Sequence, residues 1–119
     1  MCFAWMFRGV CMPLFMVKKE NFEWIRSGRK GIDVRKRKKE KGDKAVFLCS
    51  KWMLKGKIIR KEQGKLSDVV NESNFRDIVP VAKNLKEAIA YIGRLYGAGE
   101  EEFTAYYFRL TSKRPKVIM

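Results

Sequence analysis

The chain has 119 residues, 46% of them hydrophobic, which fits one folded domain and excludes a disordered protein. Lysine and arginine number 27 against 13 aspartates and glutamates, so the formal net charge is +14. The sequence has no histidine, which excludes histidine-based catalytic triads and histidine-ligated metals.

The positive charge is concentrated in the first half of the sequence. Residues 1–65 hold 19 of the cationic side chains and only 6 of the acidic ones. A one-sided excess favours a polyanionic partner, RNA or DNA. The alternative is a lysine-rich surface that serves solubility or thermal stability.

The three cysteines, Cys2, Cys11 and Cys49, are odd in number and lack the paired spacing of a metal site. We expect free thiols in a reducing compartment, and therefore a cytoplasmic protein without a disulfide framework. Neither a metal nor another cofactor is expected.

Residues 1–17 are mostly apolar, but an arginine, a glycine and a proline interrupt a run already shorter than the about 20 residues that cross a bilayer. No basic segment precedes it, as one would in a signal peptide. We expect residues 14–17 to enter the core as the first strand, and residues 1–12 to be an appendage. A peripheral membrane contact through this segment is the alternative that we rank last.

Residues 21–35, NFEWIRSGRKGIDVR, contain the pattern on which the functional prediction depends. The spacing of the apolar residues predicts a short amphipathic helix, which Gly28 ends in the left-handed conformation. A basic pair follows, and the alternation over residues 32–35 predicts a half-buried strand with Asp33 and Arg35 on its outer face.

Residues 36–44, KRKKEKGDK, form a basic run that ends in a Gly-Asp turn signal. The uninterrupted apolar run of residues 45–49 predicts a strand buried on both faces. Residues 50–54 are expected to connect it to another strand at 56–61, and Ser67 is expected to cap a short helix.

Residues 78–81 are expected to be extended, because a proline disfavours helix in the residue before it. Asn84 and Glu87 have the spacing of a capping box and begin the clearest helix of the chain. Residues 103–110, aromatic on both alternations, predict a central strand. Separated strands with two longer helices predict an α+β fold: about five or six strands in a partly open barrel, with two main helices outside.

Several of these pieces, in this order, resemble the ASCH domain of the PUA-like superfamily, in the form of its small archaeal-type members. The pieces are FEWIRSGRKGIDVR, the Gly-Asp pair with the apolar strand AVFLC, and LKGKII. The family's signature residues correspond here to Gly28, Lys30, Asp33, Arg35, Gly42 and Asp43. The resemblance covers roughly residues 14–111. We therefore expect an ASCH domain at 13–111, with the N-terminal appendage at 1–12 before it and a basic tail at 112–119 after it.

The resemblance implies a barrel-like fold with a cleft beside the first helix that binds RNA or nucleotides. Some small bacterial members use a lysine, a threonine and a glutamate to hydrolyse the amide of N4-acetylcytidine. The lysine corresponds here to Lys30, the threonine to Asp33, which has no hydroxyl, and no residue matches the glutamate. Whether this chain is an enzyme is therefore open.

We predict a nucleic-acid-binding site at the corner formed by the helix end and the strand. Arg29, Lys30 and Arg35 would contact phosphates or base edges, and Asp33 would orient them or accept from an exocyclic amine. The alternative is a surface ion pair of Asp33 with Arg35 or Lys30, worth ~0–1 kcal/mol.

The basic loop and two tryptophans complete the predicted site. Arg37, Lys38 and Lys39 would follow phosphates, which adds affinity without sequence information. Trp24 and Trp52 would stack on unpaired bases. The alternative is a solvated loop together with tryptophans that belong to the core.

Two functions of different class follow from these residues. The first is an RNA- or nucleotide-binding module that uses the basic cleft after the first helix. The second is a small amidohydrolase acting on a modified nucleoside such as N4-acetylcytidine, with Lys30 as the activating base and Asp33 holding a water. The sequence decides neither this question nor the identity of the RNA nor the oligomeric state.

Overall fold

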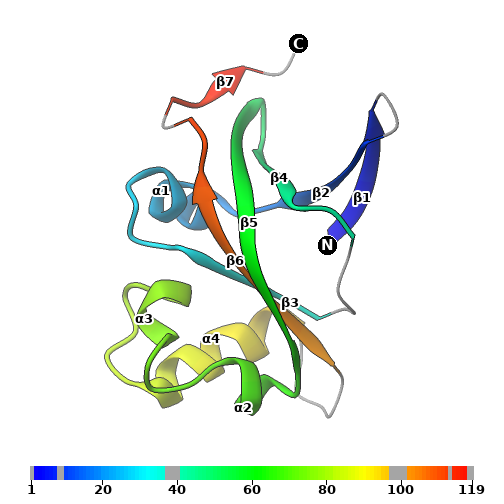
Figure 1. Cartoon of the computed structure of the whole chain (residues 1–119). Helices are drawn as coiled ribbons and strands as arrows, with labels where there is room; N and C mark the ends of the chain where they lie inside the picture. The colour runs from blue at the N-terminus through cyan, green and yellow to red at the C-terminus, as the bar shows by residue number, and fades with distance from the viewer. Residues whose placement is uncertain (1, 8–9, 37–40, 97–101, 113, 118–119) are drawn as a thin grey trace.

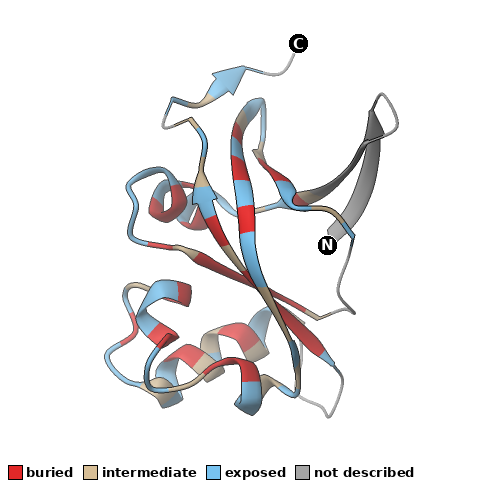
Figure 2. Ribbon diagram, in the orientation of Figure 1, coloured by how far each residue is buried: buried red, intermediate tan, exposed pale blue. Residues whose placement is uncertain are grey.

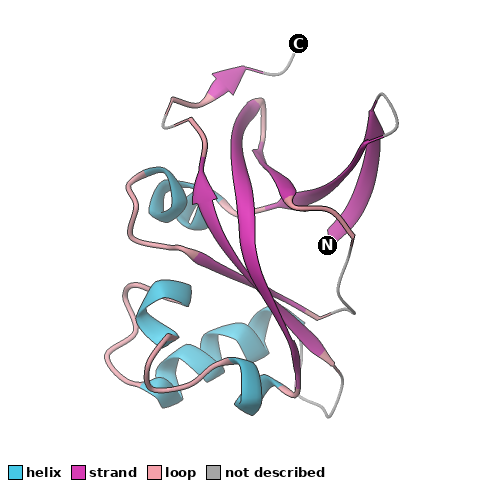
Figure 3. Ribbon diagram, viewed as in Figure 1, coloured by secondary structure: helices cyan, strands magenta, loops and turns pink. Residues whose placement is uncertain are grey.

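Figure 1 shows the computed structural model, which describes residues 2–7, 10–36, 41–96, 102–112 and 114–117. The described strands are β1 Cys2–Phe7, β2 Val10–Met16, β3 Ile32–Arg35, β4 Lys44–Cys49, β5 Trp52–Gly64, β6 Phe103–Leu110 and β7 Lys116–Val117. The described helices are α1 Lys19–Arg26, α2 Leu66–Val69, α3 Phe75–Ile78 and α4 Leu85–Tyr96. Figure 3 shows these helices and the strands, which belong to a single sheet.

The strands follow the order β1-β2-β4-β5-β6-β3, and β7 pairs with the start of β5. All pairs are antiparallel except β2 with β4. The sheet curls into a half-barrel. Three strands separate β2 from β3 in the sheet, yet the Arg35 guanidinium on β3 lies 5.3 Å from the centre of the Phe15 ring on β2. The α+β prediction of a partly open barrel is confirmed.

The core has two parts. Figure 2 shows that buried segments occur both in the strands and in the helices. One part lies inside the curl, where Phe15, Phe47, Tyr106 and Phe108 pack together. The other lies between the sheet and the helices α2, α3 and α4. These three helices gather at one end of the sheet, beside β3, the second half of β5 and the first half of β6 (Figure 1).

Most of the expected elements are present, and some boundaries differ. The run of residues 45–49 lies in β4, and β6 is central, between β5 and β3. The Asn84 side chain accepts a hydrogen bond from the Glu87 N–H at 2.9 Å, as a capping box requires. The expected connection at 50–54 is shorter, because β5 already begins at Trp52.

Two local predictions are wrong. Residues 78–81 do not form one extended segment: α3 continues to Ile78, and Pro80 and Val81 lie in a turn. Val79, the residue before the proline, has φ −126° and ψ 89°. The short helix α2 begins after Lys65, so Ser67 lies inside it and does not cap it.

The ends of the chain add strands to the sheet. β1 pairs with β2 along its whole length, and β7 pairs with Trp52 and Met53. The division into an appendage at 1–12, a domain at 13–111 and a tail at 112–119 stays a prediction. Within the described residues, no helix has the length and apolar character needed to cross a membrane.

Candidate functional site

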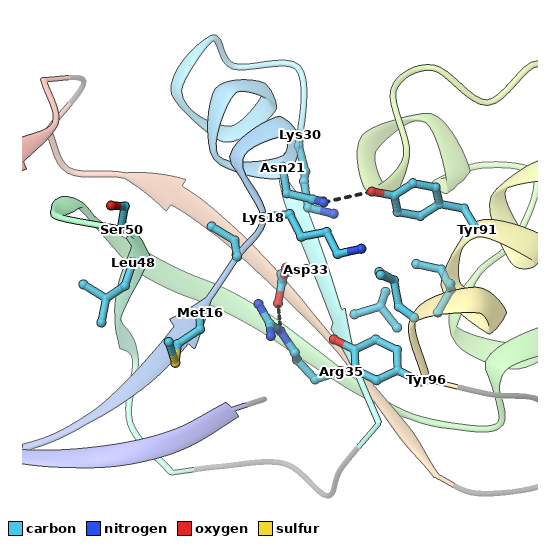
Figure 4. A pocket seen from close by; sticks show the side chains of 14 residues that line it. Met16, Lys18, Asn21, Lys30, Asp33, Arg35, Leu48, Ser50, Tyr91 and Tyr96 are labelled. Atoms are coloured by element: carbon cyan, nitrogen blue, oxygen red, sulfur yellow. Dashed lines mark hydrogen bonds and ion pairs between the residues drawn. The ribbon is translucent and has the colours of Figure 1, made fainter.

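A hollow of about 460 Å³ lies at the seam where the half-barrel does not close, between β2 and β3. Helix α1 and the last two turns of α4 border it, and Figure 4 shows their side chains around it. Its volume is within the usual range of small-molecule sites. The hollow is lined by Met16, Val17, Lys18, Asn21, Lys30, Asp33, Val34, Arg35, Leu48, Ser50, Tyr91, Ile92, Leu95 and Tyr96.

Strand β3 carries the acidic and basic side chains into this hollow. All four of its residues are buried, so the expected half-buried strand with a solvent-facing side is wrong. Ile32 and Val34 belong to the core under the helices, whereas the side chains of Asp33 and Arg35 are 6% and 5% exposed. The face that would have met solvent on a flat sheet meets the seam instead.

Asp33 and Arg35 form an ion pair inside the seam. Arg35 donates from Nε to Asp33 Oδ2 at 2.5 Å, and its guanidinium lies over the Phe15 ring. The pair is buried, so the alternative of a surface ion pair between these two residues is wrong. Burial makes it costly to remove either partner alone.

Lys30 enters the same hollow because of how helix α1 ends. Gly28 has φ +83°, as expected for a left-handed helix terminus, and the N–H groups of Arg29 and Lys30 both donate to the Trp24 carbonyl. This tight turn directs the Lys30 side chain inward, where it is 4% exposed and donates from Nζ to the Ile78 carbonyl at 2.6 Å. Burial lowers the pKa of Lys30 to about 8, against the opposing effect of Asp33.

Polar groups join the two walls of the hollow at its mouth. Asn21 on α1 donates from Nδ2 to the Tyr91 hydroxyl on α4 at 3.0 Å, and both are visible in Figure 4. Lys36 donates from Nζ to the Tyr96 carbonyl at 2.9 Å. Lys18 is exposed at the rim. Burial raises the pKa of Tyr91, so its hydroxyl keeps its proton across the physiological range.

The sequence did not indicate Asn21, Tyr91 or Tyr96 as site residues. Asn21 and Tyr91 are 70 positions apart, and only the packing of α4 across the open seam brings them together. The spacing along α4 does place Tyr91 and Leu95 on one face of the helix, but no local pattern indicates that this face borders a hollow.

The other predicted site residues lie elsewhere. Arg29 is exposed and does not line the hollow. Trp24 is 8% exposed and packs in the core against Tyr91, which contradicts a stacking role for its ring. Trp52 is 40% exposed and borders a neighbouring hollow. Arg37, Lys38 and Lys39 lie outside the described residues.

In the described part of the chain, no three His, Cys, Asp or Glu side chains lie close enough together to hold a metal ion.

Comparison with known proteins gave structural matches only. No family model and no curated sequence matches the chain. The solved hypothetical protein PH0355 has a TM-score of 0.67 at 19% identity, covering 82% of this chain and 96% of its own. ASCH from Zymomonas mobilis has a TM-score of 0.63 at 17% identity, covering 87% of this chain and 69% of its own. The chain therefore has the fold of these structures, and the ASCH fold that the resemblance in the sequence predicts is confirmed.

Proposed function

We propose that the chain binds RNA or a nucleotide, with a base entering the hollow between β2 and β3. The observation that carries this proposal is the burial of three charged side chains, Lys30, Asp33 and Arg35, beside a hollow that is open to solvent. The ASCH fold of the chain is compatible with this function but does not establish it.

Burial of these charges is difficult to explain by stability. Charged side chains are seldom fully buried, and an apolar replacement of a buried ion pair is often neutral or stabilising. A lysine whose pKa is lowered by burial, next to an ion pair and a cavity, is typical of a functional site. The same three positions would otherwise be suited to the apolar residues that occupy the rest of the core.

The chemistry of the hollow suits a nucleobase. The Asp33 carboxylate can accept from an exocyclic amine, and the Arg35 guanidinium can donate to a ring nitrogen or carbonyl. Met16, Leu48 and Leu95 supply apolar surface for the base plane. Lys18 is exposed at the rim, where a phosphate of the same nucleotide would remain in solvent. Lys36 adds a second cation on the side of Tyr96, to whose carbonyl its amine donates.

Binding is tested with labelled single-stranded and structured RNA across a salt series, followed by anisotropy. We expect Arg35→Met to abolish or strongly weaken binding, while Lys57→Met, which removes the same charge from an exposed position on β5, leaves it nearly unchanged. Wild-type affinity no greater than that of an unrelated protein with the same lysine content would reject the proposal.

The second candidate function is hydrolysis of a modified nucleoside such as N4-acetylcytidine. The observation that favours it is the lowered pKa of Lys30, because a neutral amine can accept a proton near physiological pH. Asp33 would hold the attacking water. Incubation of N4-acetylcytidine with the wild type and with Lys30→Ala tests it: turnover by the wild type alone supports hydrolysis, and equal turnover or none counts against it.

A further inference from the structure

A second hollow, of about 620 Å³, lies next to the first. It is bordered by α1, by the turn between β4 and β5, and by the segment that leads into β7. Ser50 lines both hollows, and the consecutive residues Lys18 and Lys19 line one each. The two hollows therefore adjoin at Ser50, which Figure 4 shows at the edge of the first.

Trp52 is presented at this second hollow on a short turn. Cys49 pairs with Trp52, so only Ser50 and Lys51 connect the two strands, and Ser50 has a positive φ of 55°. The backbone of Trp52 is held by β4 on one side and by Val117 of β7 on the other. An exposed ring on a backbone paired on both sides loses little freedom when it binds a partner.

Exposed apolar side chains are concentrated around the two hollows. Among the large hydrophobic residues of the described chain that are exposed, Met16 and Leu95 line the first hollow and Trp52 lines the second. Val117 is directly opposite Trp52 in the register. Ile59 and Val81 line neither hollow. Three of the six exposed large hydrophobic side chains therefore line one of the two hollows, and exposed apolar groups gathered beside a hollow are typical of a binding site.

Cations accompany the exposed ring. Lys51 Nζ lies 5.8 Å from the centre of the Trp52 ring, and Lys19 borders the same hollow. The one acidic residue in its lining, Glu23, is paired with Arg26 at 2.6 Å. An exposed aromatic ring beside cationic side chains is the arrangement with which proteins bind single-stranded nucleic acid.

We propose that the second hollow is a subsite for the nucleotide adjacent to the one in the first hollow, with its base stacked on Trp52 and the backbone passing over Ser50. This inference rests on the proposed function and extends it: the preferred ligand is a single-stranded oligonucleotide of at least two nucleotides, and a free nucleoside fills half of the site.

A length series tests the subsite. The affinities of a cytidine mononucleotide, dinucleotide, trinucleotide and hexanucleotide are measured by calorimetry with the wild type, Trp52→Ala and Trp52→Phe. We expect the affinity of the wild type to rise from one nucleotide to two. Trp52→Ala should bind the dinucleotide about 5- to 150-fold more weakly than the wild type does, and the mononucleotide with the same affinity. Trp52→Phe keeps most of the rise, because the phenyl ring still stacks.

The control is Ile59→Ala, which shortens an exposed apolar side chain on the same strand outside both hollows. It leaves the whole length series unchanged. Thermal unfolding of each variant, followed by circular dichroism, verifies that the variants are folded. Quenching of tryptophan fluorescence on dinucleotide binding, absent in Trp52→Phe, locates the second base at this ring.

The outcomes separate the subsite from the proposed function. Mononucleotide binding with no gain from a second nucleotide, or a gain that Trp52→Ala retains, overturns the subsite and leaves the function intact. No binding at any length rejects the function itself. Equal binding of a glutamate peptide with the charge of the hexanucleotide also overturns the subsite, because the surface would then recognise charge without stacking.

Discussion

Lys30 Nζ donates a hydrogen bond to the Ile78 carbonyl, 48 residues away in the sequence, at a distance of 2.6 Å. This contact ties the turn after α1 to the end of α3. The same amine lines the hollow at the seam and has a pKa lowered to about 8 from its ordinary value of 10.5. The protonation state of the Lys30 amine therefore affects both the stability of the protein and the chemistry of the site.

The first prediction concerns the stability of the wild type at alkaline pH. Between pH 8 and 10.5 the unfolded chain keeps a proton on Lys30 that the folded chain has lost. The folded state is then favoured as pH rises, by up to about 3 kcal/mol relative to Lys30→Met. Urea unfolding of both proteins from pH 7 to pH 10 measures the difference, and parallel curves would contradict it.

The second prediction concerns the buried ion pair. Arg35→Met leaves Asp33 without its partner at 2.5 Å, so we expect a loss of about 3–5 kcal/mol in the free energy of unfolding. The double variant with Asp33→Leu regains most of this stability, because no buried carboxylate is then left without its guanidinium. It does not regain ligand binding. A double-mutant cycle by urea unfolding measures both effects, and additive losses would contradict the coupling.

The third prediction separates backbone conformation from packing at the turn that positions Lys30. An added Cβ at Gly28 meets no atom within 4 Å, yet its φ of +83° disfavours any side chain. Gly28→Ala should therefore cost about 1–2 kcal/mol. Gly93 also has free space but lies in α4, so Gly93→Ala should stabilise by about 0.5–1 kcal/mol. Thermal unfolding of both variants measures the two changes in stability. If both variants were stabilised, or both destabilised, the explanation by backbone conformation would be contradicted.

Local sequence patterns predict a structural feature of this fold correctly where that feature depends on a single segment of the chain. The glycine after α1, the capping contact between Asn84 and Glu87 and the central position of β6 all depend on neighbours in sequence or on a long apolar run. The burial of Asp33 and Arg35 depends on the curl of a sheet whose strands come from both ends of the chain. Alternation along β3 contains no information about that curl.

The prediction that the Trp24 ring stacks on a base is wrong for a related reason. Helix α1 buries two faces: Phe22 and Ile25 enter the core inside the half-barrel, and Trp24 enters the core under α4. A helix at the surface of a sheet normally buries one face, so a tryptophan beside charged neighbours is expected to be exposed. The second layer that covers it, including Tyr91, lies far along the chain.

The fourth prediction distinguishes the two candidate functions by the sign of their pH dependence. A Lys30 that holds a ligand as a cation loses affinity as pH rises through about 8, because the amine loses its charge. A Lys30 that acts as a general base gains turnover over the same range, because only the neutral amine accepts a proton. Dinucleotide affinity and N4-acetylcytidine hydrolysis are measured from pH 6.5 to 9.5. Lys30→Met flattens whichever profile Lys30 controls, so a slope that persists in this variant shows that the titrating group lies elsewhere.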